Sequence, residues 1–532
     1  MSCAHDWLHD VEGVGAGRQA GGGERNLRVM NASEGGATIS SDTTLIPSRR
    51  PRSVGDKRMA SDSSSWTRHV PLLSGGFALT VYLGWRWLEA TRVKVVNAGE
   101  AGSKYANLIK QCKSAERYWP SVLGIHSALE LVPFIWIGSR KTNRLSFTAE
   151  DVVMDDGEAV QLCWYKCSTR TGPSGGIPSF DSDSEVPIVM LHHGLLCGAS
   201  DLPGQGYIKQ GLSKGWYVCA LNRRGHVSRR PPLTQPKFHI FGSTSDVRAV
   251  VEHIRGTKRP AAPLYMVGLS SGSGLVASVI GEQGESLMKD SHPSFVNGVV
   301  GVAPGYNIEK CMSRIKFPYH QVLLERAKAF FLGRNQTLLH QLPGFKEMNE
   351  AKCLQTFLDE SYPFGGYASK EEMYLKINPM RTIVHVRDPA LFINAENDPI
   401  CVLENIEEHI HLFQVNKGAT LLLTKMGSHL PFHEFSFNPL RFECWAERVA
   451  FEFLEAAEGH RQASPSTSCP VSASPSPDPR GRPGAEEGQS NFDASSPSSP
   501  LNSALNFSSP GDGDNNDVSP WSTVKSPQAR ER

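Results

Sequence analysis

The sequence predicts an α/β fold in which helices flank a mostly parallel central sheet. Short, continuously apolar runs recur along the middle of the chain, as expected of strands that are covered on both faces. Stretches with apolar residues at helical spacing lie between these runs, and such alternation builds parallel sheets wrapped by helices. The predicted strands lie at residues 186–191, 216–221, 264–267, 298–303, 390–393 and 419–424.

The regular part of the chain begins with a predicted hairpin. Val152–Asp155 and Ala159–Trp164 are short strand candidates around Asp156-Gly157, a dipeptide that favours a tight turn. The hairpin and the parallel strands together indicate one domain over residues 115–455.

One long insertion interrupts this domain. About 85 residues separate the strand that ends near Ala303 from the strand that begins near Ala390. That length exceeds a single crossover helix, so we expect a helical cap over residues 304–388. Caps of this kind shape substrate pockets.

Both ends of the chain differ in composition from its middle. Residues 1–65 and 460–532 are rich in Ser, Gly, Pro, Asp and Arg, and hydrophobic residues make up only 39% of the 532-residue chain. Because such segments bury too little surface to offset the entropy of ordering, we predict two disordered tails. The net charge of +1 gives no electrostatic reason to expect nucleic-acid binding.

The eleven cysteines indicate reduced thiols and an intracellular protein. Their number is odd, and none forms a C-x-x-C pair. Cys163 and Cys167 are close in sequence, but no second pair of cysteines or histidines completes a zinc site.

An uncharged run precedes the domain and leaves two interpretations open. Val70–Trp85 contains no charged residue, and Trp66 and Trp87 lie close to its two ends. Terminal aromatic residues suit a bilayer interface, but the run is shorter than the ~20 residues of a spanning helix. Residues 66–92 therefore form either a single-pass membrane anchor, with the endoplasmic reticulum as a candidate location, or a buried helix. Basic residues flank both ends, so the orientation stays open.

A strand-turn-helix motif around Ser270 is the strongest functional signal. The predicted strand 264–267 leads into Gly-Leu-Ser-Ser-Gly at 268–272, and an apolar helix is predicted directly after it. A serine nucleophile on such a sharp turn needs small residues two positions before and two positions after it. Ser271 and Ser273 lack a glycine two positions earlier, so the register selects Ser270. A structural turn is the alternative reading.

A serine nucleophile also needs a base, and the base needs an orienting acid. In this arrangement the acid follows the serine along the chain, and the histidine follows the acid. Asp398 lies in the loop after a predicted strand and is the favoured acid, with Glu396 as its rival, whereas Asp388 precedes the strand. His429, directly after Gly-Ser in the next such loop, is the favoured base, with His433 as the alternative.

The developing oxyanion needs backbone donors, for which the sequence offers the N–H groups of Leu195 and Ser271. His192 and His193 are adjacent like metal ligands. Adjacent strand residues point to opposite faces, however, and no carboxylate or cysteine cluster joins them. We therefore expect no metal and no cofactor.

The chain resembles an α/β-hydrolase group that holds membrane-anchored animal lipases, plant embryogenesis-associated hydrolases and fungal medium-chain ethyl-ester synthases. The resemblance runs from about residue 118 to 453. It rests on Tyr118-Trp-Pro120, Asp156-Gly157 with Trp164, His193-Gly194-Leu195, Gly198-x-Ser200, Asn222-x-Arg224-Gly225-His226, the Ser270 motif, Phe364-Gly365-Gly366-Tyr367, Asn397-Asp398-Pro399-Ile400 and Gly427-Ser428-His429. It implies an α/β-hydrolase fold and a charge-relay system of Ser270, Asp398 and His429.

The resemblance also implies activity on acyl esters, and a membrane anchor as in many members of the group. Leu269 and Ser273 depart from the usual motif, and these departures leave the acyl-chain preference open. We expect a serine carboxylic-ester hydrolase that acts on acylglycerols or other medium-to-long-chain esters. Acyl transfer to an alcohol, amide hydrolysis and non-catalytic ligand binding are the rival functions.

Overall fold

The structure is a computed structural model that describes most of the chain between residues 80 and 464. The described ranges are 80–99, 103–131, 145–165, 185–227, 233–257, 262–288, 294–438 and 443–464. The predicted N-terminal tail lies outside these ranges. The last helix, α17 (Trp445–Ala463), extends into the segment predicted as the C-terminal tail, and the rest of that segment lies outside the described residues.

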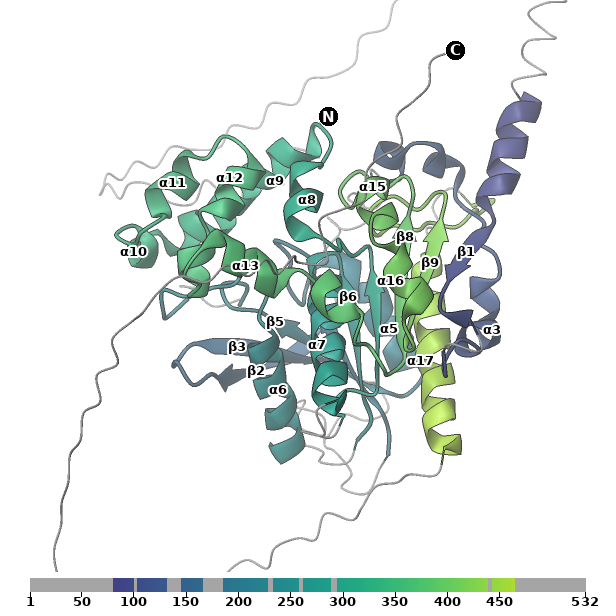
Figure 1. The fold of residues 1–532 in the computed structure, drawn as a ribbon, viewed down its shortest axis with the longest axis horizontal. Coiled ribbons are helices and arrows are strands. Elements are labelled where there is room, and N and C mark those ends of the chain that lie inside the picture. The colour runs from purple at the N-terminus through teal and green to yellow at the C-terminus, as the bar shows by residue number, and fades with distance from the viewer. Residues whose placement is uncertain are drawn as a thin grey trace, which may run out of the picture. The chain divides into compact units, whose positions relative to one another are not determined.

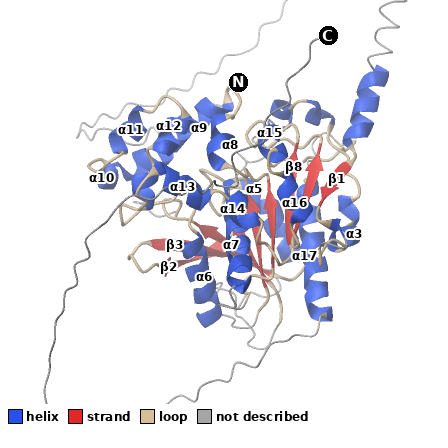
Figure 2. Cartoon of the chain, viewed as in Figure 1, coloured by secondary structure: helices blue, strands red, loops and turns tan. Residues whose placement is uncertain are grey.

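A nine-stranded sheet lies at the centre of the described part (Figures 1 and 2). Across the sheet, the strands are β1 (Val93–Val96), β9 (Ala419–Thr424), β8 (Ala390–Ala395), β7 (Gly298–Val302), β6 (Leu264–Leu269), β4 (Ile188–His192), β5 (Tyr217–Asn222), β3 (Ala159–Tyr165) and β2 (Phe147–Val153). The six strands from β9 to β5 run parallel. The remaining three pair antiparallel at the two edges. The predicted fold class is confirmed.

Two strands differ from the sequence prediction. β2 begins at Phe147 rather than at Val152, because it pairs with β3 residue by residue from Phe147 to Val153. β1 was not predicted at all. Both are edge strands with exposed residues, so neither carries the continuous apolar run that marks a covered strand.

Helices cover both faces of the sheet (Figure 2). Alternate residues of each strand point to opposite faces, as Met190 and Leu191 of β4 do, and so build two separate apolar clusters. One cluster includes residues of α6 (Thr244–Thr257), α7 (Ser271–Met288) and α16 (Ile410–Val415). The other includes residues of α3 (Leu108–Gln111), α5 (Leu202–Ser213) and α17.

Short helices fill the segment between β7 and β8, and most of them gather at one end of the molecule (Figure 1). They are α8 (Ile308–Ser313), α9 (Tyr319–Ala327), the π-helix η6 (Lys328–Leu332), η7 (Gly333–Asn335), α10 (Gln336–Leu339), α11 (Phe345–Glu350), α12 (Leu354–Asp359), η8 (Tyr362–Gly365), α13 (Lys370–Ile377) and α14 (Met380–Ile383). Their core also takes in Phe238, which stacks on Phe331 and Phe364 with ring centroids 5.0 and 5.2 Å apart. The Phe238 N–H donates to Phe364 O at 2.9 Å.

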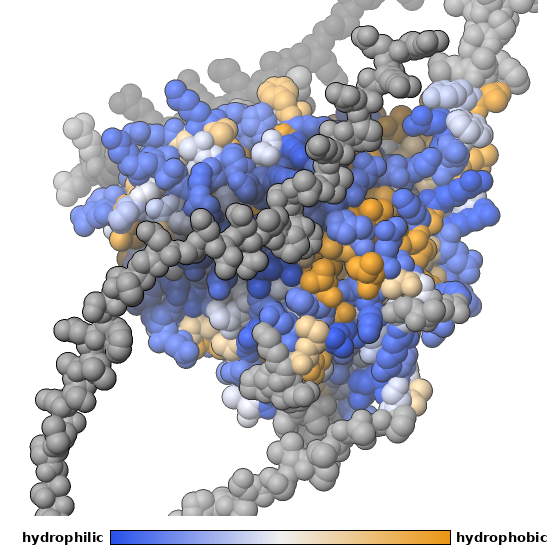
Figure 3. Space-filling model, in the orientation of Figure 1, coloured by the Kyte–Doolittle hydropathy of each residue, from blue (hydrophilic) through white to orange (hydrophobic). Residues whose placement is uncertain are grey.

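A helix over residues 80–90 precedes β1. The start of the uncharged run, residues 70–79, lies outside the described residues. The buried-helix interpretation is wrong for the part that is described, because five large apolar side chains on it are 41–55% exposed, namely Val81, Tyr82, Leu83, Trp85 and Leu88. Within the described ranges, no helix combines the length and the hydrophobicity that crossing a membrane requires. The face of the molecule seen in Figure 3 is mainly hydrophilic, with hydrophobic side chains in separate groups.

Candidate active site

Ser270 is the single residue between strand β6 and helix α7. β6 ends at Leu269 and α7 begins at Ser271, so the chain reverses direction at a single residue. Ser270 has φ +52°, in the left-handed region that side chains other than glycine rarely adopt. Its N–H donates to Val302 O at 2.8 Å, and its carbonyl accepts the Ser273 N–H at 2.9 Å. The turn is therefore fixed on both sides.

The two glycines of the motif are required by close backbone contacts. A Cβ on Gly268 would lie 2.3 Å from Gly272 O, and a Cβ on Gly272 would lie 2.3 Å from His192 O. Real side chains do not approach backbone atoms so closely. The end of β4 thus packs directly against the start of α7, beside Ser270.

A continuous chain of hydrogen bonds joins the three residues that the sequence singled out. His429 Nε2 lies 2.8 Å from Ser270 Oγ, and His429 Nδ1 lies 2.8 Å from Asp398 Oδ2. Both the histidine and the aspartate are buried. With Nδ1 donating to the carboxylate, Nε2 is left as the acceptor for the serine hydroxyl. This arrangement can take the proton of Ser270 as the hydroxyl attacks an electrophile.

Asp398 follows β8 and is held as an acceptor on both of its oxygens. Oδ1 accepts the N–H groups of Ile400 and Cys401 at 2.8 and 2.9 Å, while Oδ2 faces His429. These hydrogen bonds fix the orientation of the carboxylate toward the histidine. Asp398, and not its rival Glu396, therefore reaches the imidazole.

The loop that carries His429 has a strained backbone and is held by hydrogen bonds to other segments. Gly427, Ser428 and Leu430 all have positive φ. Ser428 Oγ donates to Ser127 O at 3.0 Å, and Ser428 N–H donates to Asn397 Oδ1 at 2.9 Å. The segment around residue 127 thus supports the histidine loop, a role that its sequence does not reveal.

The alternative base, His433, belongs to this bracing region. Its N–H donates to Oε1 of the buried Glu130 at 3.0 Å, and its carbonyl accepts Tyr118 Oη–H at 2.9 Å. Burial lowers the pKa of His433 to about 4. The buried Glu130 and Tyr118 beside it were likewise not foreseen as part of the site's support.

The two predicted oxyanion donors belong to backbone segments next to Ser270. A Cβ on Gly194 would lie 3.4 Å from Ser270 Cβ, so the backbone leading into Leu195 passes directly by the serine. Ser271 is the first residue of α7, where helix N–H groups lack partners within the helix.

Comparison with known proteins agrees with this architecture. A family model described as the alpha/beta hydrolase fold matches residues 187–436, the part that carries Ser270, Asp398 and His429. The chain has the α/β-hydrolase fold.

Three relatives show how far this chain is similar to named proteins. Human protein ABHD15 is 29% identical over 252 residues, which cover 46% of this chain and 50% of that protein. Bovine phospholipase ABHD3 is 22% identical over 380 residues, 70% of this chain and 87% of that protein. A monoacylglycerol lipase of Saccharomyces cerevisiae is 23% identical over 260 residues, 48% and 56% respectively. The match to the first of these relatives therefore spans only half of its length.

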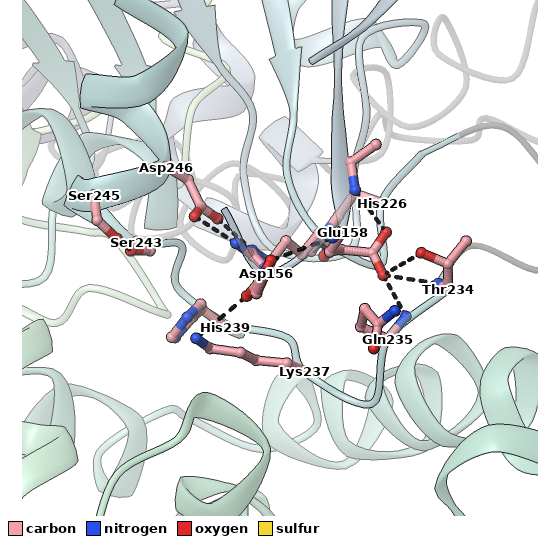
Figure 4. Close-up of polar contacts among 12 residues, drawn as sticks. Asp156, Glu158, His226, Thr234, Gln235, Lys237, His239, Ser243, Ser245 and Asp246 are labelled. Atoms are coloured by element: carbon pink, nitrogen blue, oxygen red, sulfur yellow. Dashed lines mark hydrogen bonds and ion pairs between the residues drawn. The ribbon is translucent and has the colours of Figure 1, made fainter. Parts of the chain in front are cut away.

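A cavity of about 250 Å³ opens beside Ser271, where α6 and α7 meet the cap. Its wall mixes apolar groups with hydroxyl and charged groups. Among the lining residues are Lys237, His239, Ser243, Ser245, Leu275, Ile308, Tyr367 and Lys376. Figure 4 shows Lys237 and His239 near Asp156, within a network that links the β2–β3 turn to the start of α6. Burial lowers the pKa of His239 to about 4, so its ring is neutral near pH 7.

Asp398, Cys401 and His429 could also be considered as metal ligands, because their ligand atoms lie within 4.8 Å of one another. The aspartate and the histidine, however, already bond to each other. The Cys401 thiol donates to Ala303 O at 3.2 Å, and a neighbouring thiol together with burial raises its pKa well above the usual range. A metal ligand would have to be the thiolate, so the arrangement favours a hydrogen-bonded chain.

Proposed function

We propose that the protein is a serine carboxylic-ester hydrolase that acts on acyl esters of lipids. One observation carries the proposal, namely the pair of 2.8 Å hydrogen bonds that links Ser270 Oγ through His429 to Asp398. A serine hydroxyl is a weak nucleophile at neutral pH, and this arrangement of base and acid activates it.

In the first half of the reaction, Ser270 Oγ attacks the ester carbonyl carbon. His429 Nε2 takes the hydroxyl proton, and Asp398 stabilises the imidazolium that forms. The negative charge on the carbonyl oxygen is received by the N–H groups of Leu195 and Ser271. Collapse of the tetrahedral intermediate breaks the C–O bond, and the leaving alcohol takes the proton from His429.

In the second half, water attacks the acyl group on Ser270. His429 removes a proton from the water and then returns it to Ser270 Oγ as the acid is released. The left-handed backbone of Ser270 presents the hydroxyl at the carboxyl edge of the sheet for both steps.

Two observations support lipid esters as the substrates. Relatives of the chain are named as a phospholipase and as a monoacylglycerol lipase. Exposed apolar side chains also flank the histidine loop. Trp87 contacts Trp119 and Phe435, with ring centroids 5.5 and 5.6 Å apart, and Phe437 beside them is 95% exposed. Aromatic side chains of this kind suit a lipid–water interface, so we propose that this face meets a membrane.

A fluorophosphonate probe tests the nucleophile directly. The wild-type protein is expected to be labelled, and Ser270→Ala is expected to lose both labelling and ester hydrolysis. Ser273→Ala is a matched control, because the buried Ser273 hydroxyl donates to the Ser270 backbone carbonyl and takes no part in the hydrogen bonds among Ser270 Oγ, His429 and Asp398. Labelling that survives in Ser270→Ala would refute the assignment.

A substrate panel then tests the class of ester. We expect release of fatty acid from monoacylglycerols or phospholipids, with the same dependence on Ser270. Adding ethanol as a competing acceptor separates hydrolysis from acyl transfer, because transfer yields the ethyl ester. Hydrolysis of amides alone would contradict the proposal.

A further inference from the structure

Arg223 is a buried cation next to the candidate oxyanion site. It follows β5 directly and is only 3% exposed. Its neighbour Arg224 is 4% exposed as well, but Arg224 forms ion pairs with Asp156 and Asp246, each at 2.7 Å. Among the described residues, no carboxylate lies within 4 Å of the Arg223 guanidinium. Burial lowers the pKa of Arg223 to about 10, so the group stays charged at neutral pH.

The guanidinium contacts the Gly194–Leu195 peptide and the side chain of Ser271, the two segments that were predicted to hold the oxyanion. Arg223 Nη2 donates to Gly194 O at 3.0 Å and to Ser271 Oγ at 3.2 Å. Nη1 donates to Phe241 O at 3.0 Å, which anchors the side chain from behind, while Nε has no partner. The cation thus bridges the loop after β4 and the start of α7.

His193 lies against the same carbonyl. Its Nδ1 lies 2.8 Å from Gly194 O and 3.2 Å from Arg223 Nη2, and its Nε2 accepts the Arg223 backbone N–H at 3.4 Å. Burial holds the pKa of His193 well below its usual value, so the ring is neutral. Gly194 O therefore accepts a hydrogen bond from Arg223 and faces the His193 ring on the same side.

Because a peptide is planar, the direction of the Gly194 carbonyl fixes the direction of the Leu195 N–H. In a trans peptide, the C=O of one residue and the N–H of the next point in opposite directions. Because Gly194 O is held toward Arg223 and His193, the Leu195 N–H must point away from them. The same stretch of backbone passes Ser270, as the short distance from Gly194 to Ser270 Cβ requires.

We propose that Arg223 is a positioning residue for the oxyanion site. It holds the Gly194–Leu195 peptide and the Ser271 side chain in place. Its unpaired positive charge contacts the carbonyl end of the peptide whose N–H end is proposed to bind the oxyanion. This inference rests on the proposed function, because it assigns a role in the same ester-hydrolysis step.

The unpaired charge supports a role in the reaction, through positioning of the oxyanion site, rather than a role in folding alone. Burying a cation without a carboxylate partner is costly for stability, and a loop could be anchored as well by neutral donors. In a poorly solvated site, however, a fixed positive charge selectively favours a state in which negative charge forms nearby. Arg224, which has two carboxylate partners, has no unpaired positive charge to offer in this way.

Arg223→Lys and Arg223→Gln test the proposal, with Arg224→Lys as the matched control. The lysine variant keeps a charge but cannot reach Gly194 O and Ser271 Oγ at once, and the glutamine variant loses the charge. Deleting one oxyanion donor typically costs ~10²–10³ in rate, so loss of a group that positions both should lower kcat roughly 10- to 100-fold. We expect the glutamine variant to lose more than the lysine variant, and KM to change little in either.

Two further measurements separate positioning from folding. A boronic acid, which forms a tetrahedral anion on the serine, should bind more weakly by the same factor as kcat falls, whereas a neutral product should bind as before. Arg224→Lys should lower the urea midpoint, because it disturbs the two ion pairs seen around Asp156 and Asp246 in Figure 4, yet keep the wild-type kcat per folded molecule.

The outcomes are distinct. If both Arg223 variants keep wild-type kcat and boronic-acid affinity, or if Arg224→Lys loses kcat equally, the inference is overturned while the proposed function stands. If the wild-type protein hydrolyses no ester and takes no fluorophosphonate label, the proposed function fails and the role of Arg223 fails with it.

Discussion

Replacing Glu130 by glutamine should make the protein more stable at alkaline pH. Glu130 is fully buried behind the histidine loop, where Oε1 accepts the His433 N–H and Oε2 has no partner. Burial raises the pKa of its carboxyl from 4.5 to about 7, although the hydrogen bonds from His433 and Tyr118 oppose the shift. Glutamine reproduces the neutral form and keeps the acceptor for His433.

The sign and size of the effect follow from this shift. Below pH 4.5, the carboxyl is protonated in both the folded and the unfolded state, so it imposes no penalty. Between pH 4.5 and about 7, the unfolded state loses the proton first, and the stability of the folded state falls as pH rises. Above pH 7 the penalty is complete, at about 3 kcal/mol, since each unit of pKa is worth ~1.4 kcal/mol.

Urea unfolding of the wild type and Glu130→Gln from pH 5 to pH 8.5 measures this difference. The advantage of the variant should grow from under ~1 kcal/mol at the acid end to about 3 kcal/mol at the alkaline end. Glu447, whose pKa burial also raises to about 7, serves as a control, because it titrates in both proteins and cancels in the comparison. A stability difference that does not change with pH would refute the reasoning.

Three further predictions concern the candidate site itself. Gly272→Ala should abolish activity and strongly destabilise the protein, because its Cβ would lie 2.3 Å from His192 O. Gly256→Ala is the control, since its Cβ would meet no atom within 4 Å. In thermal unfolding, the control should be neutral or stabilising by ~1 kcal/mol. Asp398→Asn should lower kcat by ~10⁴ while circular dichroism stays native, since the imidazole loses its orienting charge; a loss below tenfold would contradict this. Phe437→Asp should lower activity on vesicle-borne ester by roughly tenfold or more, and leave hydrolysis of a soluble short-chain ester unchanged. Equal effects on both substrates would exclude an interfacial role.

The sequence was most informative where a strand is covered on both faces. The parallel strands β4 to β9 are buried along their whole length, so each leaves a continuous apolar run. Edge strand β1 has only four residues with Lys94 among them, and it forms through pairing with β9. Helices of the cap run for only three to nine residues and depend on tertiary packing, so their bounds could not be read from periodicity.

In the candidate site, the sequence likewise predicted some residues and not others. Ser270, Asp398 and His429 each follow a strand, and the strand order brings them to one edge of the sheet, so their meeting could be predicted. The residues that support the site could not be predicted. Arg223 stands at the unspecified position of a recognisable motif, and Glu130 lies in a stretch without regular pattern; both act only through contacts between distant segments.

The stacking of Phe238 between two rings of the cap limits how substrate can enter. Phe238 belongs to the segment after β5, yet it is buried with Phe331 and Phe364 as part of the cap. Lifting the cap as a rigid lid would separate Phe238 from Phe331 and Phe364, which stay in the core of the cap. Exposing the Phe238 side chain, at roughly 200 Å² and ~25 cal/mol per Å², costs about 5 kcal/mol. That cost is a large part of the ~5–15 kcal/mol that stabilises a typical domain, so we expect Ser270 to be reached with the cap seated.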